Sequence, residues 1–352
     1  MPRNPDSFSS VFDPRANGLN FVRLFLAAGV ILWHSFPLTG AEIDLLPLRQ
    51  LLAEVWVDGF FAISGFLILG SWMRDPHAGR YLRARILRIL PAFWVCLLVT
   101  AFIVAPLATM TFGMGNLTYV VKNAVLWVFQ YGIDGTPAGV PFPGVWNGSI
   151  WTLAWEFLCY LLILALGVTG ALRHPPVVPV LFIICVLGIA FTSLAPVEIW
   201  LVETAARFGS MFLAGALIWQ LQDRIRCNRN FVMLSILLVV GSLWLPDYRL
   251  LASLPLAYLM LVIGAVIKTP RLRLRNDISY GVYIYAFPIQ QVLALAGVWT
   301  LGVPGFASLA LAITVPVAAA SWFLIEKPVL RYKNQSLRRA PASGDGSEVR
   351  EH

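Results

Sequence analysis

Long apolar runs alternate with short polar segments along this chain. About 20 consecutive apolar residues are enough to cross the hydrocarbon core of a bilayer as a helix. Runs of roughly this length predict about ten membrane-spanning helices, at residues 19–38, 52–72, 87–109, 149–170, 177–194, 203–221, 231–246, 250–268, 277–297 and 304–326. The pattern therefore predicts an all-α fold, a polytopic membrane helix bundle.

One apolar segment is too short to be counted with these runs. Residues 117–131, LTYVVKNAVLWVFQY, include Lys122 and Asn123 and predict an interfacial or re-entrant segment. If this segment crossed the membrane, every later helix would be inverted. The chain then divides into an N-terminal segment (1–18), a transmembrane domain (19–332) and a tail (333–352), whose Ser, Arg, Ala and Gly content predicts disorder.

Composition supports the membrane interpretation. Hydrophobic residues make up 59% of the chain, charged residues 12%, and the mean hydropathy is +0.75, whereas an average soluble domain is roughly one quarter charged. No cleavable signal peptide is predicted, because residues 1–20 are polar. Three of the four cysteines lie in apolar runs and Cys227 lies in a basic loop, so no disulfide framework is predicted.

The basic residues predict the orientation, because Lys and Arg accumulate in short cytoplasmic loops. With the N-terminus inside, the outer loops hold only Arg49, Lys122 and Arg249, and the remaining Lys and Arg outside the expected helices fall on the cytoplasmic side. Both termini are therefore expected to be cytoplasmic. The net charge of +8 is then explained by contact with anionic membrane lipids, and no nucleic-acid partner is expected.

The first apolar run carries two ionisable residues, at the ends of RLFLAAGVILWH. Eleven residues of α-helix turn through about 1100°, so Arg23 and His34 share one helix face and lie about 16 Å apart along it. An ionisable residue inside a membrane is by default a candidate functional residue. In the alternative interpretation, Arg23 only snorkels to the inner surface and His34 only lies near the outer headgroups.

Two acidic residues are expected at the depth of His34. Asp58 in VWVDGFFAISGFLI and Glu156 in SIWTLAWEFLCY would both lie in the outer half of their helices. A carboxylate beside an imidazole raises its basicity and fixes its tautomer, as a general base requires. Alternatively, Asp58 pairs with a buried arginine such as Arg207, and Glu156 braces the outer loop near Trp146 or Asn147.

On the inner side, GRYLRARILRILPAFW places four arginines immediately before the third expected helix. Two of them, Arg85 and Arg88, form an i, i+3 pair on one helical face. Guanidinium groups bind phosphate oxygens in a two-pronged geometry, which favours a phosphate-bearing ligand. The alternative is a juxtamembrane polybasic anchor for anionic lipids.

Six blocks occur in order between residues 18 and 331: GLNFVRLFLAAGVILWH, VWVDGFFAISGFLI, RYLRARILRILPAFW, SIWTLAWEFLCYLL, DISYGVYIYAFPIQQ and WFLIEKPVLR. Together they resemble the acyltransferase 3 family of integral membrane O-acyltransferases. The resemblance implies a multi-pass protein of the cell inner (plasma) membrane. It also implies transfer of an acetyl or other acyl group from cytoplasmic acyl-CoA to a hydroxyl of an extracytoplasmic or lipid-linked glycan, such as O-antigen or exopolysaccharide, without a metal.

The resemblance also assigns roles to particular residues. The family motif of a basic residue, ten others and a histidine matches Arg23 and His34, and the histidine is regarded as catalytic. The R-x-x-R motif, matched by Arg85 and Arg88, is associated with the acyl-CoA donor. We therefore expect His34 to be the catalytic residue, either as general base or as acetyl acceptor, with help from Asp58 or Glu156. We expect Arg23, Arg85 and Arg88 to bind the donor.

The sequence departs from the family pattern in three places. Many members have a histidine where this chain has Ala286. Only a short tail follows Glu326, so a stand-alone core without an SGNH hydrolase-like domain is expected. Ser35 and Phe36 follow His34, so any acidic partner must come from another helix. A transporter or exporter of a lipid-linked glycan is the competing hypothesis, because helix-breaking Gly and Pro beside intramembrane charges fit transporters too.

Overall fold

The computed structural model describes residues 7–194 and 199–331, and within them every regular element is helical. The expected disordered tail, 333–352, lies outside the described residues. The principal helices are α2 (Leu19–Leu38), α3 (Leu46–Ala53), α4 (Val55–Arg74), α5 (Ala78–Val99), α7 (Met114–Asn123), α8 (Thr152–Val168), α9 (Val177–Leu194), α10 (Trp200–Gln220), α11 (Arg229–Ser242), α12 (Arg249–Val266), α13 (Ser279–Leu295) and α14 (Gly302–Ser321).

Smaller elements extend or connect these helices. A π-helical turn (Thr100–Val104) and α6 (Ala105–Thr109) prolong α5, and a second π-helical turn (Trp322–Glu326) prolongs α14. The short α1 (Phe8–Val11) precedes α2. Single 3₁₀ turns lie at Ala171–Arg173, Pro270–Leu272 and Val298–Leu301.

Each of the ten expected ranges overlaps one of the principal helices. Among the described residues, seven helical segments are long and apolar enough to cross a membrane, and α8 and α11 are shorter apolar helices. The remaining helix, α13, is buried along almost its whole length. The protein is therefore a polytopic membrane helix bundle, as the hydrophobic pattern predicts.

Two local expectations can be compared directly with the helices. The α7 helix has ten residues and is about 15 Å long, too short to cross a bilayer by itself, in line with a segment that does not span. The arginine cluster was expected before the third span, but α5 begins at Ala78, so these arginines lie in its first turns. Helix-favouring Arg, Leu and Ala dominate this stretch, which explains the early start.

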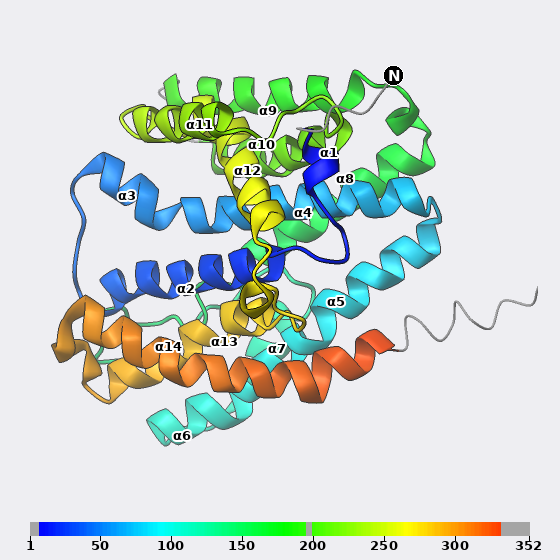
Figure 1. Cartoon of the computed structure of the whole chain (residues 1–352). Coiled ribbons are helices and arrows are strands. Elements are labelled where there is room, and N and C mark those ends of the chain that lie inside the picture. The colour runs from blue at the N-terminus through cyan, green and yellow to red at the C-terminus, as the bar shows by residue number, and fades with distance from the viewer. Residues whose placement is uncertain (1–6, 195–198, 332–352) are drawn as a thin grey trace, which may run out of the picture.

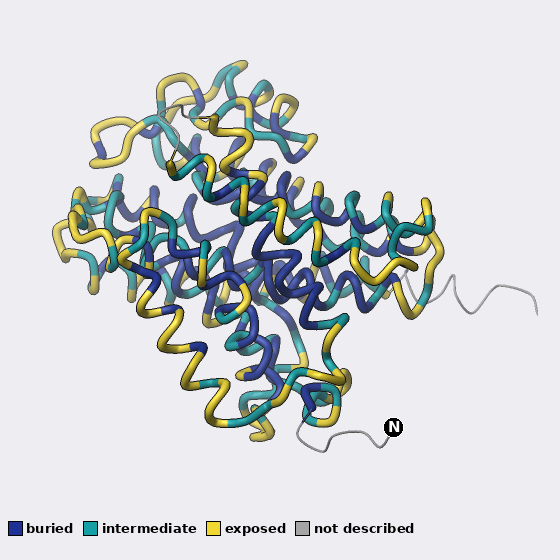
Figure 2. Tube along the Cα trace, turned by 90° about the horizontal axis from the view of Figure 1, so that it is seen from above, coloured by how far each residue is buried: buried dark blue, intermediate teal, exposed yellow. Residues whose placement is uncertain are grey.

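Helices α4, α10 and α13 are largely buried, whereas α9, α11 and α14 expose apolar side chains. In Figure 2 the buried stretches of the chain lie in the interior of the bundle and the exposed stretches lie toward its margin. The closest contact is between α4 and α10, where a Cβ at Gly65 would clash with the carbonyl oxygen of Phe212, and a Cβ at Gly215 with that of Ala62. Small residues let two membrane helices approach this closely.

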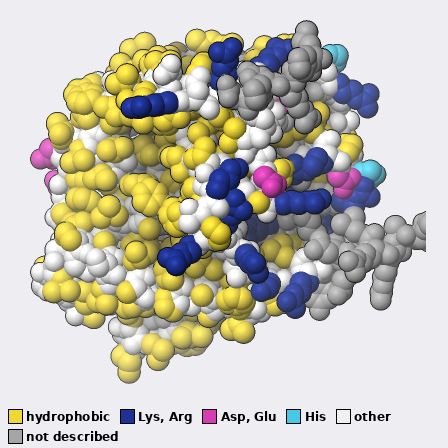
Figure 3. Space-filling view, in the orientation of Figure 1, with side chains coloured by type: hydrophobic (Ala, Val, Ile, Leu, Met, Phe, Trp, Pro, Cys, Tyr) yellow, Lys and Arg dark blue, Asp and Glu magenta, His cyan; other side chains and the backbone are white. Residues whose placement is uncertain are grey.

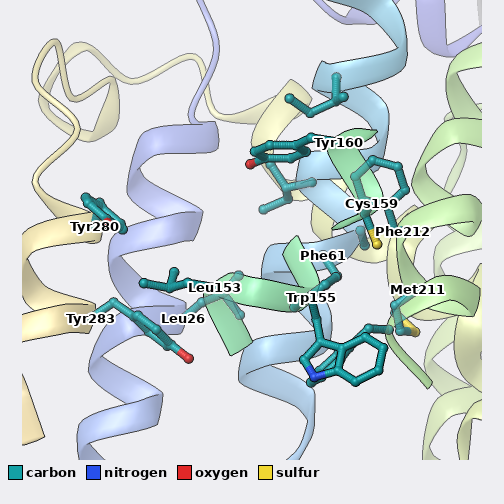
Figure 4. Close-up of a cluster of buried hydrophobic side chains, with 14 of the residues drawn as sticks. Leu26, Phe61, Leu153, Trp155, Cys159, Tyr160, Met211, Phe212, Tyr280 and Tyr283 are labelled. Carbon is teal, nitrogen blue, oxygen red and sulfur yellow. The ribbon is translucent and has the colours of Figure 1, made fainter. Parts of the chain in front are cut away.

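Aromatic side chains fill the space between the central helices. Figure 4 shows Tyr160 from α8 and Phe212 from α10 within one buried cluster, with Tyr280 and Tyr283 entering from α13. Phe61 of α4 stacks on Phe208 of α10 with ring centroids 4.3 Å apart. This packing holds α8 and α13 against α4, and these three helices carry Asp58, Glu156 and Tyr283.

Basic side chains gather at one end of the bundle. Figure 3 shows most Lys and Arg side chains toward the right of this face, whereas hydrophobic side chains cover its left and centre. We call this the arginine-rich end. It comprises the start of α2, the end of α4, the start of α5 and the loop before α13, with Arg15, Arg74, Arg80, Arg273 and Arg275.

Candidate functional site

A cavity of about 160 Å³ lies between α2, α4, α5, α8 and α13. Its wall includes all three arginines expected to bind the donor, Arg23, Arg85 and Arg88, and also Glu156 and Tyr280. Four of the six candidate residues that the sequence singled out therefore meet at one place. The cavity opens near the arginine-rich end, because Arg85 and Arg88 belong to the early turns of α5.

Two of these arginines share one carboxylate. Asp277, in the loop before α13, accepts hydrogen bonds from Arg23 Nη1 at 2.6 Å and from Arg88 Nη2 at 2.5 Å. Arg88 Nη1 also pairs with Glu326 at 3.3 Å, and the Ser279 hydroxyl donates to Asp277 at 2.5 Å. Buried charges must be paired, so Arg23 and Arg88 have their positive charges largely neutralised within the protein.

Asp277 and Glu326 were not identified from the sequence, although both stand in the quoted blocks DISYG and WFLIEKP. The signal that could have found them is charge balance. Arginines buried in a bundle require carboxylates, and few acidic residues lie in or beside the apolar runs of this chain.

Arg85 has a different environment from its neighbours. Its guanidinium lies over the rings of Tyr81 and Tyr160, at 5.7 and 5.9 Å from their centroids. Within the described part of the chain it makes no ion pair, and its buried Nε has no hydrogen-bond partner. A cation held over aromatic faces without a carboxylate is available to an anionic ligand.

Glu156 faces the same cavity rather than the outer loop. Its Oε1 accepts hydrogen bonds from the Ser64 hydroxyl at 2.8 Å and from the Tyr160 hydroxyl at 2.5 Å. The contacts of Glu156 therefore tie α8 to α4 beside Arg85. Among the described residues, none of its hydrogen bonds reaches His34.

His34 lies farther along α2, toward the end opposite the arginines. Its ring meets the edge of Phe287 from α13, with centroids 5.0 Å apart, and Gly148 leaves room for that phenylalanine. The buried Nδ1 of His34 has no hydrogen-bond partner among the described residues. An unpartnered buried ring nitrogen is costly in a structural histidine, so a ligand that supplies the missing bond is favoured here.

Asp58 does not accompany His34. It is fully buried and accepts hydrogen bonds from the Tyr248 hydroxyl and from Arg249 Nε, the latter at 2.6 Å. Glu54 pairs with the same Arg249 and, at 2.8 Å, with Arg207, which lies 3.7 Å from Asp58. We call these residues the α4–α12 ion network.

This network corrects two expectations. Among the residues that the structure describes, no hydrogen bond joins His34 to Asp58 or Glu156, and Asp58 pairs with two arginines, one of them buried, which was the alternative interpretation. Arg249 was assigned to an outer loop, yet it begins α12 with 3% exposure. The two arginines supply the opposite charge that a buried carboxylate such as Asp58 requires.

Polar and aromatic groups occupy the space between Arg23 and His34. Arg23 lies over the Phe60 ring at 5.8 Å, and Phe60 contacts Tyr283 of α13 edge to face. The Tyr283 hydroxyl donates to the Ser149 carbonyl at 2.8 Å and lies 2.5 Å from the Thr152 hydroxyl. Phe60, Thr152 and Tyr283 belong to α4, α8 and α13, three of the helices that line the cavity, and Ser149 lies in the loop before α8.

The position of the missing family histidine is also clear. Ala286 has 1% exposure and packs in a second apolar cluster with Ala27 and Ile31 of α2.

No group of three or more His, Cys, Asp or Glu side chains with metal-binding geometry occurs among the described residues.

Comparison with known proteins gives the family. The chain is 26% identical to "O-acetyl transferase" of Shigella phage Sf6, across 92% of this chain and 98% of that protein. It is also 26% identical to "Nodulation protein 10" of Rhizobium leguminosarum bv. viciae, across 92% of this chain and 95% of that protein. No solved structure matches the chain. A family model described as "Acyltransferase domain" matches residues 16–325, nearly the whole bundle, and the chain therefore belongs to the acyltransferase 3 family of membrane enzymes.

Proposed function

We propose that this enzyme moves an acetyl group from cytoplasmic acetyl-CoA to a hydroxyl of an extracytoplasmic or lipid-linked glycan, such as O-antigen or exopolysaccharide, in the inner membrane. Family membership supports acyl transfer, and the name of the phage relative supports acetyl transfer to oxygen. The observation that carries the proposal is the arrangement along α2. Arg23 lines a cavity with Arg85 and Arg88, and His34 lies about three turns farther along the same helix face.

The donor enters from the arginine-rich end, which we place at the cytoplasmic face because Lys and Arg accumulate there. Arg85 contacts the donor directly, since its guanidinium lines the cavity without a carboxylate among the described residues. Arg23 and Arg88 shape the cavity wall through their shared contact with Asp277. The acyl end of an extended donor then reaches toward His34.

His34 acts as general base. Its ring nitrogen takes the proton of the acceptor hydroxyl while the hydroxyl oxygen attacks the carbonyl carbon of the thioester. The carbon–sulfur bond breaks, and the leaving thiolate takes the proton back from the imidazolium. Each turnover gives one acetyl ester and one free thiol. Glu156 acts as a positioning residue of the donor cavity, and Asp58 holds α4 against α12.

The alternative chemical route is covalent, with His34 accepting the acetyl group before the sugar does. Direct transfer predicts that rapid quenching of enzyme with radiolabelled acetyl-CoA leaves no label on His34 and that initial rates follow single-displacement kinetics. A trapped acetyl-histidine that is consumed when acceptor is added would exclude direct transfer.

The test of the overall function uses two histidine variants in cells. We expect His34→Ala to abolish acetylation of envelope glycans, seen by mass spectrometry, while the amount of glycan at the surface stays unchanged. His174→Ala is the matched control, because His174 is exposed in a loop. Loss of surface glycan in the His34 variant would instead indicate an exporter, and full acetylation in that variant would remove His34 from the chemistry.

Donor binding is tested separately in purified protein. Arg85→Gln should weaken the affinity for coenzyme A by about tenfold, because it removes a charge-assisted contact without breaking an ion pair. If the affinity of the Arg85→Gln variant for coenzyme A were unchanged, Arg85 would be assigned to the alternative role of a lipid anchor.

A further inference from the structure

A second and larger cavity opens at the arginine-rich end. Its volume is about 970 Å³, against 160 Å³ for the cavity around Arg85. Small-molecule sites span roughly 300–1,000 Å³, so the smaller cavity has room for part of a coenzyme and the larger one for a nucleotide. The larger cavity is bounded by the segment before α2, the end of α4, the end of α10 and the loop at 270–275.

Four arginines line the larger cavity: Arg15, Arg74, Arg273 and Arg275. Within 7–194 and 199–331 none of them forms an ion pair, and Arg273 donates only to a backbone carbonyl, at 3.4 Å. By contrast, Arg23 and Arg88 share the carboxylate of Asp277. A concave surface with four uncompensated guanidiniums concentrates anions and suits a ligand that carries several phosphate groups.

The same cavity contains aromatic and amide side chains. Phe12 and Phe66 meet edge to face at 5.1 Å, and Trp219 reaches the wall beside Gly70, where a Cβ would clash with the indole. Aromatic faces stack on nucleobases and thereby add to the affinity for a nucleotide. Gln222 adds a side-chain amide to the wall, whereas the amide of Asn17 is held by local backbone hydrogen bonds. Aromatic faces beside arginines favour a phosphorylated nucleoside over a lipid headgroup, which has no base to stack.

The two cavities share a wall. Leu67 of α4 lines both, and Asn20 of the larger cavity precedes Arg23 of the smaller one by about one helical turn on α2. A ligand with a bulky anionic end and a narrow arm can therefore place its anionic end in the larger cavity and its arm in the smaller one.

We propose that the larger cavity binds the phosphorylated nucleotide end of the acyl-CoA donor, so that the thioester arm passes Arg85 on its way to His34. This inference rests on the proposed function. It places the phosphates of the nucleotide on Arg15, Arg74, Arg273 and Arg275, and it leaves the R-x-x-R pair along the path of the arm.

The test measures binding to purified protein in nanodiscs of zwitterionic lipid, with three probes: coenzyme A, S-acetylpantetheine, which lacks the nucleotide, and adenosine 3′,5′-bisphosphate, which lacks the arm. We expect the double variant Arg74→Gln with Arg273→Gln to raise the Kd for coenzyme A by about 100-fold, since it removes two charge-assisted contacts that are each worth about tenfold in affinity. The Kd for S-acetylpantetheine should not change. Adenosine 3′,5′-bisphosphate should compete with coenzyme A in the wild type and lose this ability in the variant.

The matched control is Arg224→Gln with Arg229→Gln, which removes the same charge from exposed positions that do not line the cavity. Equal effects of the control and cavity variants on coenzyme A would overturn the inference, as would equal weakening of S-acetylpantetheine. Competition by anionic lipid but not by the bisphosphate would assign the cavity to headgroups. Failure of the proposed function would give a different result from failure of this inference, because the wild-type protein itself would then bind no coenzyme A.

Discussion

Because Asp58 belongs to the α4–α12 ion network, we expect it to stabilise the fold and to take no part in catalysis. The carboxylate of Asp58 is fully buried, accepts hydrogen bonds from Tyr248 and Arg249, and lies 3.7 Å from Arg207. The change Asp58→Ala removes one of the two carboxylates, Asp58 and Glu54, that lie between the two arginines. The remaining charges are then unbalanced inside the bundle.

The magnitude follows from what each arginine keeps. Removing one partner of a buried ion pair costs about 3–5 kcal/mol. Arg249 keeps Glu54 and also Asp247, whose Oδ2 lies 2.9 Å from Nη1, so the lower end of that range applies. A loss of about 3 kcal/mol raises the unfolding equilibrium constant by roughly 150-fold.

The assay titrates a denaturing detergent into mixed micelles and follows the folded fraction by circular dichroism, with acetyl transfer measured per folded molecule. We expect Asp58→Ala to unfold at lower denaturant while the folded fraction keeps a transfer rate within a few-fold of wild type. The double change Asp58→Leu with Arg249→Met should be less destabilising than Asp58→Ala, because it removes one charge of each sign and leaves Glu54 paired with Arg207 at 2.8 Å.

Asp75→Ala is the control for this series. Hydrogen bonds from Arg80, and secondarily from His77, lower the pKa of Asp75 to about 2, so this carboxylate is ionised at neutral pH. The group is exposed, and exposed ion pairs contribute little to stability, so no measurable shift is expected. The reasoning would be refuted if Asp58→Ala unfolded like wild type and lost transfer as completely as His34→Ala.

Three further predictions concern the stability of the bundle and its affinity for coenzyme A. Gly65→Ala should destabilise the bundle by about 1–3 kcal/mol, because the added methyl group meets the backbone of Phe212. The control Gly241→Ala, where the methyl group has no neighbour within 4 Å, should change stability by less than about 1 kcal/mol. Equal effects of the two changes would contradict the close contact of α4 and α10. Asp277→Asn should cost about 3–5 kcal/mol because two arginines share its carboxylate, and a fully stable variant would show that they find other partners. Glu156→Gln should lower the Kd for coenzyme A, since it removes a negative charge from the donor cavity, whereas unchanged affinity with abolished transfer would assign Glu156 to the chemistry of His34.

The sequence predicts the helices well because the length of an apolar run is a local property. All ten expected ranges overlap a helix, and the short segment around Lys122 overlaps only the ten-residue α7. The start of α5 is the clearest error, since hydropathy marks where a chain enters lipid and does not mark where a helix begins. The arginines of that segment are polar, yet they continue the helix.

The ion pairs could not be predicted in the same way. Asp58 and Arg249 are separated by 191 positions, and Arg23 and Asp277 by 254. Charge balance requires that such residues be paired, but it does not say which carboxylate meets which arginine. The shared face of Arg23 and His34 follows from helix geometry alone, whereas the absence of an acidic partner at His34 among the described residues depends on how α4 and α8 are rotated in the bundle.

The division of the arginines into paired and unpaired sets bears on how a donor is recognised. An arginine already bound to a buried carboxylate must give up that contact before it can bind a phosphate, and the exchange leaves a buried negative charge behind. Arg23 and Arg88 are in this position, because both hold Asp277. Arg85 and the arginines of the larger cavity make no ion pair in the part of the chain that the structure describes. An anionic donor would therefore gain most from the unpaired set, whereas we expect Arg23, held by Asp277, to shape the cavity wall without giving up its carboxylate.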